Sequence, residues 1–90
     1  MRVAIAGVTG AVGEEFLRVL EKRNFPVSEL RPLASARSAG KTVRFRGQDY
    51  PVQELRDDSF KGMDLALFSA GGSVSRNFRQ AVVDSGAVMV

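Results

Sequence analysis

Three glycines at three-residue intervals follow the first apolar run of this sequence and limit what the chain can fold into. The run at residues 3–6 leads into GVTGAVGEEF, in which the glycines are Gly7, Gly10 and Gly13. Glycine loses more backbone freedom on folding than any other residue, so it is costly inside regular structure. Three glycines so close together therefore indicate a tight turn where another group approaches the backbone.

The spacing of apolar residues changes from that of a strand to that of a helix across these glycines. Residues 2–6 read as a short strand buried on both faces of a parallel sheet. Residues 11–23 then predict a helix, with acidic residues in the first turn and basic residues in the last, which suits the helix dipole. Asn24 and Pro26 predict its end. The apolar face of this helix is Val12, Phe16, Val19 and Leu20.

A second strand–helix–strand unit closes the sequence. Residues 64–69 are a short apolar strand, residues 73–85 repeat the helical spacing, and residues 87–90 form a last apolar strand. Gly86 predicts the end of the helix. The apolar face of this second helix is Val74, Phe78, Ala81 and Val82.

The middle of the chain predicts a strand, a hairpin and a turn. Residues 30–35 read as a strand that leads into the loop SARSAGK. Residues 42–46 alternate apolar and polar side chains, with Val43 and Phe45 on one face, and should pair with residues 50–54. Residues 57–62 read as a turn or a single helical turn.

Two such units predict an α/β fold: a doubly wound, mainly parallel sheet with a helix on each face and a β-hairpin extension. If both units run outward from a shared centre, the strands at residues 2–6 and 64–69 lie side by side. Their carboxyl-terminal loops then flank the crevice in which doubly wound sheets bind ligands. The 90 residues are expected to form a single domain.

The glycine spacing is one residue longer than the G-x-G-x-x-G dinucleotide fingerprint, but the same physics applies. Gly7 and Gly10 permit a tight turn, and Gly13 lets the helix pack on the strand, so that amide groups at the helix start face a phosphate. Thr9 is expected to cap the helix and to offer its hydroxyl to that phosphate. The alternative is a turn that holds no ligand. The position of the three glycines between a strand and an amphipathic helix favours nucleotide binding.

The loop after the second predicted strand points to the cofactor. NAD-binding domains usually carry a carboxylate there for the ribose hydroxyls, whereas this sequence has none between Arg31 and Arg46. Ser35, Arg37 and Ser38 stand there instead, and a guanidinium binds a 2′-phosphate in a bidentate way. We therefore predict NADP, against the alternative of a solvated loop.

The last residue of the strand at residues 64–69 and the loop that follows are all small residues: Ser69, Ala70, Gly71 and Gly72. These residues either line the cofactor or simply close the turn, and both readings remain open. Ser73 or Ser75 is expected to cap the second helix.

Composition excludes several kinds of chemistry. The chain has no cysteine and no histidine, and therefore no disulfide, no thiol nucleophile and no imidazole base. No apolar run is long enough to cross a membrane, and no signal peptide is recognised, so a cytoplasmic location is expected.

The net charge is +3. The basic cluster lacks an aromatic platform, so we expect a solvated sheet face and no nucleic acid. Its members are Arg31, Arg37, Lys41, Arg44 and Arg46.

Three motifs in register resemble one enzyme family. GVTGAVGEEFLRVL, LASARSAGK and DLALFSAGGSVS are similar, in this order, to the N-terminal cofactor-binding domain of aspartate-semialdehyde dehydrogenase. The resemblance covers essentially the whole chain. Val8 departs from the usual G-A-T-G-A-V-G but leaves the glycines unchanged. N-acetyl-glutamyl-phosphate reductases share the glycine turn, while the other two motifs are closer to the semialdehyde enzyme.

The resemblance implies an oxidoreductase of lysine, threonine and methionine biosynthesis, which reductively dephosphorylates aspartyl phosphate with NADPH. It implies that Arg37 and Ser38 hold the 2′-phosphate, and that residues 69–72 border the adenosine and nicotinamide. The pyrophosphate would be held by Thr9, Gly10, Ala11 and Val12.

The resemblance also shows what these 90 residues lack. The family uses a catalytic cysteine and a histidine, and these 90 residues contain neither. We therefore expect a domain that binds cofactor without turnover, because the family's catalytic and dimerisation domain is not part of it. The alternative is a minimal scaffold that folds without binding cofactor. An apolar strand at residues 87–90 would leave an exposed edge, through which copies of the chain could associate.

Overall fold

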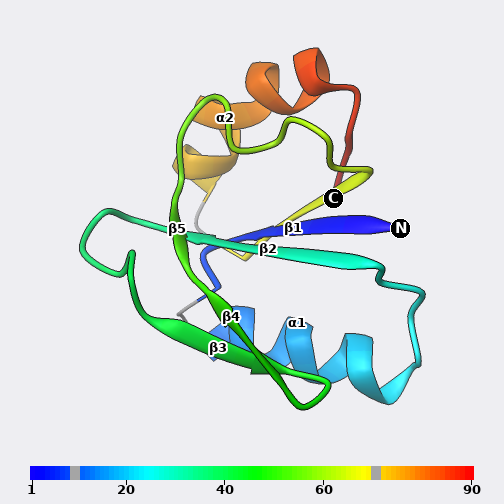
Figure 1. The fold of residues 1–90 in the computed structure, drawn as a ribbon. Helices are drawn as coiled ribbons and strands as arrows, with labels where there is room; N and C mark the ends of the chain where they lie inside the picture. The colour runs from blue at the N-terminus through cyan, green and yellow to red at the C-terminus, as the bar shows by residue number, and fades with distance from the viewer. Residues whose placement is uncertain (9–10, 70–71) are drawn as a thin grey trace.

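In the part of the chain that the structure describes, five parallel strands form a central sheet (Figure 1). The structure is a computed structural model that describes residues 1–8, 11–69 and 72–90, with the backbone alone at residues 11, 12, 72 and 73. The order across the sheet is β5-β2-β1-β6-β7, and all neighbours are parallel. The strands are β1 (Arg2–Ala6), β2 (Glu29–Ala34), β5 (Gln53–Glu54), β6 (Leu65–Phe68) and β7 (Val88–Met89).

Two helices cover opposite faces of this sheet. The helix α1 (Ala11–Lys22) connects β1 to β2, and α2 (Gly72–Ser85) connects β6 to β7. In Figure 1, α1 lies below the sheet and α2 above it. The two connections run outward in opposite directions, so crossovers of the same hand place their helices on opposite faces. The predicted doubly wound fold is confirmed, with β1 and β6 side by side.

The first helix ends in a Schellman motif. Asn24 has a φ of 52°, and the N–H of Phe25 donates to the carbonyl oxygen of Leu20 at 3.0 Å. The N–H of Asn24 donates to the carbonyl oxygen of Glu21 at 3.1 Å. Asparagine enters the left-handed region more easily than most residues, which explains why the helix stops there. The prediction that Asn24 ends the helix is confirmed.

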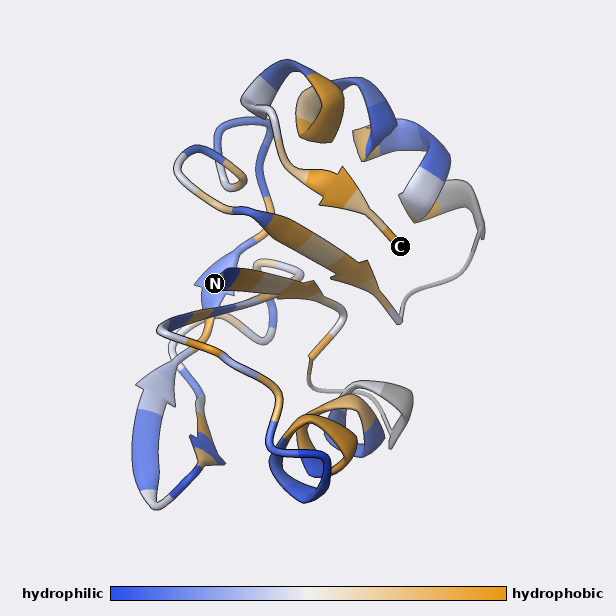
Figure 2. Cartoon of the chain, turned by 90° about the vertical axis from the view of Figure 1, so that its right-hand side faces the viewer, coloured by the Kyte–Doolittle hydropathy of each residue, from blue (hydrophilic) through white to orange (hydrophobic). Residues whose placement is uncertain are grey.

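The sheet separates two apolar layers. On the α1 side, Val3 and Ile5 of β1 are fully buried and belong to one cluster with Leu17 and Leu20 of the helix. Figure 2 shows the apolar colour concentrated on the strands and on the helix sides that face them. The predicted helical face is wrong at Val19, which is 38% exposed, because Leu17, two residues earlier on the helix, is buried instead.

The layer on the α2 side compensates for small strand residues with a large aromatic side chain. Ala4 and Ala66 are fully buried there, and Phe60 fills the space that they leave. The ring centroid of Phe60 lies 5.7 Å from that of Phe68 and 6.4 Å from that of Phe78. The turn at residues 57–62, which carries Phe60, is therefore part of the core and not only a connection.

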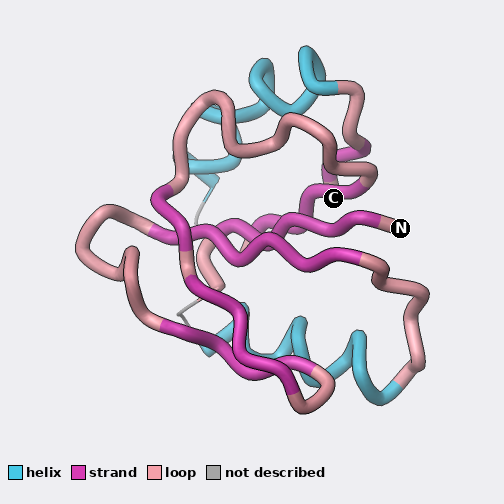
Figure 3. The backbone as a smooth tube through the Cα atoms, in the orientation of Figure 1, coloured by secondary structure: helices cyan, strands magenta, loops and turns pink. Residues whose placement is uncertain are grey.

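The predicted hairpin is present and packs beside α1 (Figure 3). It consists of β3 (Thr42–Phe45) and β4 (Gln48–Pro51), joined by Arg46 and Gly47. Both turn residues have positive φ, 51° and 78°, as a type I′ turn requires. The turn therefore lies earlier than residues 47–49, which separate the two predicted strands. Phe45 is 1% exposed and joins the α1-side cluster, as the alternation predicts.

The second strand of the hairpin is shorter than predicted. Residues 50–54 do not form one strand, because the chain changes partner at Val52. Before this residue β4 pairs with β3, and after it β5 pairs in parallel with β2 at the edge of the main sheet. Val52 is buried in the α1-side cluster, and its burial allows one segment to serve both sheets.

Candidate functional site

The carboxyl ends of three strands bring the predicted site residues to one edge of the sheet. The pairing of β1 with β2 ends at Ala6 opposite Leu33, and its pairing with β6 ends at Ala6 opposite Phe68. In Figure 1 these strands run from right to left, and the chain leaves all of them at the left. Gly7, Ser35 and Ser69 therefore follow neighbouring strands at the edge where open α/β sheets bind ligands.

The first peptides of the glycine loop are bonded to the neighbouring strand. The N–H groups of Gly7 and Val8 both donate to the carbonyl oxygen of Leu33, at 2.9 and 3.1 Å. These two amides are therefore not available to a phosphate. Gly7 has a φ of 86°, a conformation that side chains disfavour. Val8, which departs from the family pattern, is fully buried in the α1-side cluster, so its larger side chain fills the core.

The third glycine leaves room for the close approach of α1. A Cβ atom on Gly13 would lie 2.5 Å from the carbonyl oxygen of Gly7 and 2.6 Å from the Cα of Val8. Real Cβ atoms essentially never come so near to backbone. The helix start therefore rests directly on the strand end, as a dinucleotide-binding turn requires. Ala11 and Val12 form the first two helical positions, while Thr9 and Gly10 lie outside the described residues.

The hydroxyl of Ser69 is used inside the protein. Its Oγ donates to the carbonyl oxygens of Gly7, at 2.8 Å, and Ala6, at 3.0 Å. The sequence left open whether Ser69 lines the cofactor or closes the turn, and it contains no signal for this bond between two strand ends. Gly72 begins α2, and Ala70 and Gly71 lie outside the described residues.

The expectation that Ser73 or Ser75 caps the second helix is wrong. Because α2 begins at Gly72, both serines lie inside its first turn and neither occupies the position before it. An N-cap residue lies outside the helix, where its side chain reaches back to free amides. Small residues follow one another along this segment, so the sequence pattern alone did not fix the helix start.

The loop after β2 is an ordered turn that presents Arg37 to solvent. The N–H groups of Ser38 and Ala39 donate to the carbonyl oxygen of Ser35, at 2.9 and 3.1 Å. At the far end of the loop, the N–H of Gly40 donates to Val52 at 3.0 Å. Arg37 is exposed and makes no hydrogen bond or ion pair with the residues that the structure describes. Its exposed side chain is thus carried by a loop that backbone hydrogen bonds hold at both ends.

The other three arginines of the predicted basic cluster form hydrogen bonds or ion pairs within the fold. Arg31 donates to two backbone carbonyls of the turn before β6, both at 2.8 Å. Arg46 donates to two carbonyls at the carboxyl end of α1, and Arg44 pairs with an aspartate of the hairpin at 3.6 Å. Arg37 and Lys41 remain as the basic residues of the loop after β2. Positive charge is thereby presented at the edge where the three strands end.

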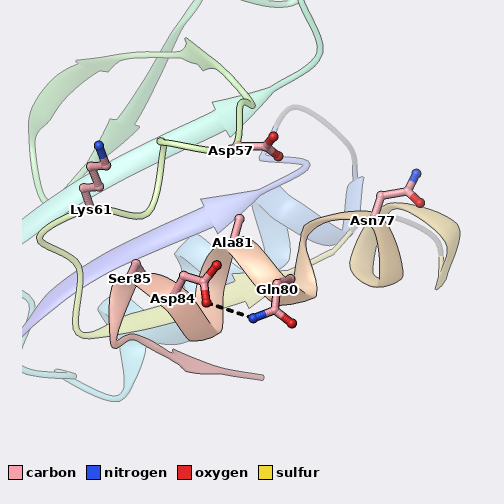
Figure 4. Close-up of a pocket in the computed structure, with 7 residues that line it drawn as sticks. All are labelled: Asp57, Lys61, Asn77, Gln80, Ala81, Asp84 and Ser85. Carbon is pink, nitrogen blue, oxygen red and sulfur yellow. Dashed lines mark hydrogen bonds between the residues drawn. The ribbon is translucent and has the colours of Figure 1, made fainter.

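A shallow hollow of about 370 Å³ lies elsewhere, between α2 and the turn before β6 (Figure 4). Figure 4 shows Asp57 and Lys61 on the turn and the other labelled residues on the helix. There Gln80 donates to Asp84 at 2.8 Å. None of the residues predicted to bind cofactor lines it. The lining residues are Asp57, Lys61, Asn77, Gln80, Ala81, Asp84 and Ser85.

Residues 1–8, 11–69 and 72–90 contain neither a helix that could span a membrane nor a cluster of metal ligands. Neither helix there combines the length and apolar character needed to cross a membrane. Within the same ranges, acidic side chains do not gather in groups of three or more that could hold a metal ion.

Comparison with known proteins shows the family to which the chain is similar. Residues 2–90 match the family model described as "Semialdehyde dehydrogenase, NAD binding domain". The chain is 57% identical to the aspartate-semialdehyde dehydrogenase of Legionella pneumophila over 90 residues, which are 100% of this chain and 26% of that protein. It is 54% identical to the Synechocystis enzyme of the same name, again over 100% of this chain and 27% of the relative.

Solved structures have the same fold. Aspartate semialdehyde dehydrogenase II from Vibrio cholerae, complexed with ASA, is 46% identical with a TM-score of 0.88, over 98% of this chain and 29% of that one. An aspartate semialdehyde dehydrogenase with NADP from Candida albicans is 24% identical with a TM-score of 0.72, over 98% of this chain and 28% of that one; at this identity the likeness concerns the fold alone. The chain spans about a quarter of the length of the relatives it matches.

Proposed function

The chain belongs to the family of semialdehyde dehydrogenase NAD binding domains, and from that premise we propose that it binds NADP(H) at the carboxyl edge of its sheet. The observation that carries the proposal is the meeting of three strand ends, which brings Gly7, Ser35 and Ser69 to one edge. Doubly wound sheets bind dinucleotides at such an edge.

The backbone packing after β1 supports the binding of a dinucleotide. A Cβ atom on Gly13 would lie 2.5 Å from the Gly7 carbonyl oxygen, so the absence of a side chain at this position lets the helix pack directly on the strand end. A pyrophosphate would be held there by residues 9–12, where helix amides and the helix dipole favour negative charge. Ser69 and residues 70–72 would border the rest of the cofactor.

NADP is proposed over NAD because of charge at the second loop. No acidic residue lies between Arg31 and Arg46, and Arg37 presents an exposed guanidinium on a loop held at both ends. A guanidinium binds the 2′-phosphate of NADP with charge-assisted hydrogen bonds, and Ser38 stands beside it in the sequence. An NAD site would place a carboxylate there for the ribose hydroxyls.

We also propose that this domain serves the reductive dephosphorylation of aspartyl phosphate to aspartate semialdehyde. The support is the identity of 57% to an aspartate-semialdehyde dehydrogenase. When bound, NADPH supplies a hydride. The chain itself contains no cysteine or histidine, so the nucleophile and the acid–base group of the family would come from outside these 90 residues. The 90 residues would thus form one cofactor-binding domain that binds without turnover.

A calorimetric titration tests the cofactor proposal. NADP+, NAD+ and 2′,5′-ADP are titrated into the chain and into Arg37→Ala. The substitution should weaken NADP+ and 2′,5′-ADP about tenfold to a hundredfold, because a hydrogen bond to a charged group contributes about 1.5–3 kcal/mol. NAD+ affinity should not change. Arg79→Ala, an exposed arginine on α2, removes the same charge elsewhere and should bind like the unsubstituted chain.

Two results of this titration would contradict the proposal. If the folded chain binds none of the three nucleotides, it is a scaffold of this fold without cofactor affinity. If NAD+ and NADP+ bind equally and Arg37→Ala changes neither, the cofactor proposal survives but the 2′-phosphate assignment fails.

A self-associating edge is the last part of the proposal. The strand β7 is an outer strand of the described sheet, and Val88 and Val90 are 61% and 68% exposed. Unpaired strand edges with apolar side chains are templates for pairing with another chain. We propose that isolated copies of the chain associate through β7.

A further inference from the structure

The hydroxyl of Ser69 connects two neighbouring strands just beyond the end of their ladder. The last paired residues of β1 and β6 are Ala6 and Phe68. One residue further, Ser69 Oγ lies 2.8 Å from the carbonyl oxygen of Gly7 and 3.0 Å from that of Ala6. The backbone N–H of Ser69 also donates to Ala6, at 2.9 Å. A serine hydroxyl has one proton, which these two carbonyls share.

The peptide that accepts this bond is held from the other side as well. The N–H of Val8, which belongs to the same peptide as the Gly7 carbonyl, donates to the carbonyl oxygen of Leu33 on β2 at 3.1 Å. Gly7 has a φ of 86° and no side chain, so its own conformational preference does little to select one orientation of the peptide. Bonds from β2 and from the end of β6 therefore decide where the Gly7 carbonyl points.

The orientation of this carbonyl determines how α1 approaches the sheet. Its oxygen lies against the first turn of the helix, only 2.5 Å from the place of a Cβ atom on Gly13. A rotation of the Gly7 peptide would change this contact and shift the start of α1. The helix start is the part of the fold that binds phosphate in dinucleotide sites.

We propose that Ser69 is a positioning residue for cofactor binding. Its hydroxyl orients the Gly7 carbonyl, and through it the start of α1, so that the amides of the helix start face the pyrophosphate. This inference rests on the proposed function. The Ser69 hydroxyl would act on the cofactor through the Gly7 carbonyl and not by direct contact. NADP and NAD share the pyrophosphate, so loss of the hydroxyl weakens both equally. Loss of Arg37, in contrast, changes the ratio between them.

The test compares Ser69→Ala and Ser69→Thr in calorimetric titrations with NADP+ and NAD+. Ser69→Ala should weaken both about fivefold, the effect of one neutral hydrogen bond, and leave their ratio unchanged. Ser69→Thr keeps the hydroxyl and should restore both affinities. Ser59→Ala is the matched control.

Ser59 suits this purpose because it is also a bonded serine but belongs to the turn before β6. It is 9% exposed, its hydroxyl donates to Glu54 at 3.2 Å, and it accepts from the N–H of Arg56 at 2.8 Å. Its substitution should lower the free energy of unfolding and leave both nucleotide affinities unchanged. A general loss of stability is thereby separated from positioning.

The possible outcomes separate this inference from the proposed function. If the unsubstituted chain binds neither nucleotide, the proposed function fails and this inference fails with it. If it binds both and Ser69→Ala binds as tightly, or changes the NADP+ to NAD+ ratio, only the positioning role is overturned. If Ser69→Ala does not fold, Ser69→Cys takes its place, because a thiol is a weaker donor. Its affinities should fall below those of the unsubstituted chain, and unchanged affinities would overturn the inference.

Discussion

Gly13 and Gly7 touch through their backbones, so that a Cβ atom on Gly13 would lie 2.5 Å from the Gly7 carbonyl oxygen. Two further atoms of Val8 would lie 2.6 Å from the same Cβ. All of these atoms are backbone, which cannot move aside as a flexible side chain can. The repeat of glycines after the first strand is therefore a steric requirement of the fold, whether or not a ligand is bound.

Gly13→Ala should destabilise the protein by about 1–3 kcal/mol, the usual cost of overpacking. At an open helical position, replacing glycine with alanine stabilises by about 1 kcal/mol. The sign of the change is therefore diagnostic, and urea unfolding measures it. An increase in the free energy of unfolding would show that the contact is looser than the structure indicates.

Arg46 connects the hairpin to the end of α1 from a position of positive φ. Its guanidinium donates to the carbonyl oxygens of Phe25 and Leu20, and its backbone N–H donates to the Glu21 carboxylate at 2.6 Å. Arg46→Ala should lower the free energy of unfolding by about 1 kcal/mol, a value kept small because the side chain is exposed.

Arg44→Ala is the control for this experiment. Arg44 lies two residues earlier on the same hairpin, and its side-chain bonds to described residues are an exposed ion pair with Asp49, at 3.6 Å, and a bond to Gly47, at 3.3 Å. Exposed pairs contribute between about 0 and 1 kcal/mol, so its loss should change stability less. Equal effects of the two substitutions in urea unfolding would rule out a special role for Arg46.

Asp64 lies just before β6, at the edge of the sheet opposite the candidate site. Its carboxylate makes the free energy of unfolding depend on pH. Its carboxylate accepts hydrogen bonds from the Arg2 backbone N–H, at 2.7 Å, and from the Arg2 guanidinium, at 3.4 Å. These bonds, the backbone one first, hold the pKa of Asp64 below its ordinary value of 3.8. The stabilisation is therefore present above the unfolded pKa and is lost as the pH falls through the lower folded pKa.

Asp64→Asn should accordingly be less stable than the unsubstituted chain near neutral pH. The difference should shrink as the pH falls below 3.8 and through the folded pKa of Asp64. Unfolding followed by circular dichroism over this range measures it. Asp58→Asn, at an exposed aspartate of the turn before β6, controls for the loss of one negative charge. A constant difference at all pH values would show that the Asp64 carboxylate does not act through its charge.

The β7 edge should make the isolated chain associate with itself as its concentration rises. Val88→Lys places a charge on the exposed strand and should reduce the association, since charged edge residues oppose strand pairing. Val83→Lys introduces the same charge at a valine on α2 that is 59% exposed, and should have less effect. Analytical ultracentrifugation distinguishes these cases. If all three chains are monomeric at every concentration, the proposed association through β7 is wrong.

Much of the architecture was predictable because local patterns carried it. Helical spacing and the stop at Asn24 predicted α1, and alternation predicted that Phe45 faces the core. The order of strand and helix segments predicted the doubly wound sheet. In each case residues close in the sequence contain the signal, since periodicity and turn chemistry act over a few residues.

Contacts between distant residues were not predictable in the same way. The chain changes partner at Val52 because this side chain is buried between the hairpin and the main sheet. Leu17 is buried in place of Val19 because of how α1 rotates against β1. Such choices depend on packing between elements, which a periodic pattern describes only approximately.

The sequence by itself determined that the chain would form a doubly wound α/β sheet, with a glycine turn after the first strand and a basic loop after the second. The tertiary structure alone decided that Ser69 would hold Gly7 across a separation of 62 residues and that Arg31 and Arg46 would brace the fold. A hydrogen bond requires an approach of about 3 Å between donor and acceptor. Only the folded chain brings atoms so distant in the sequence to that distance.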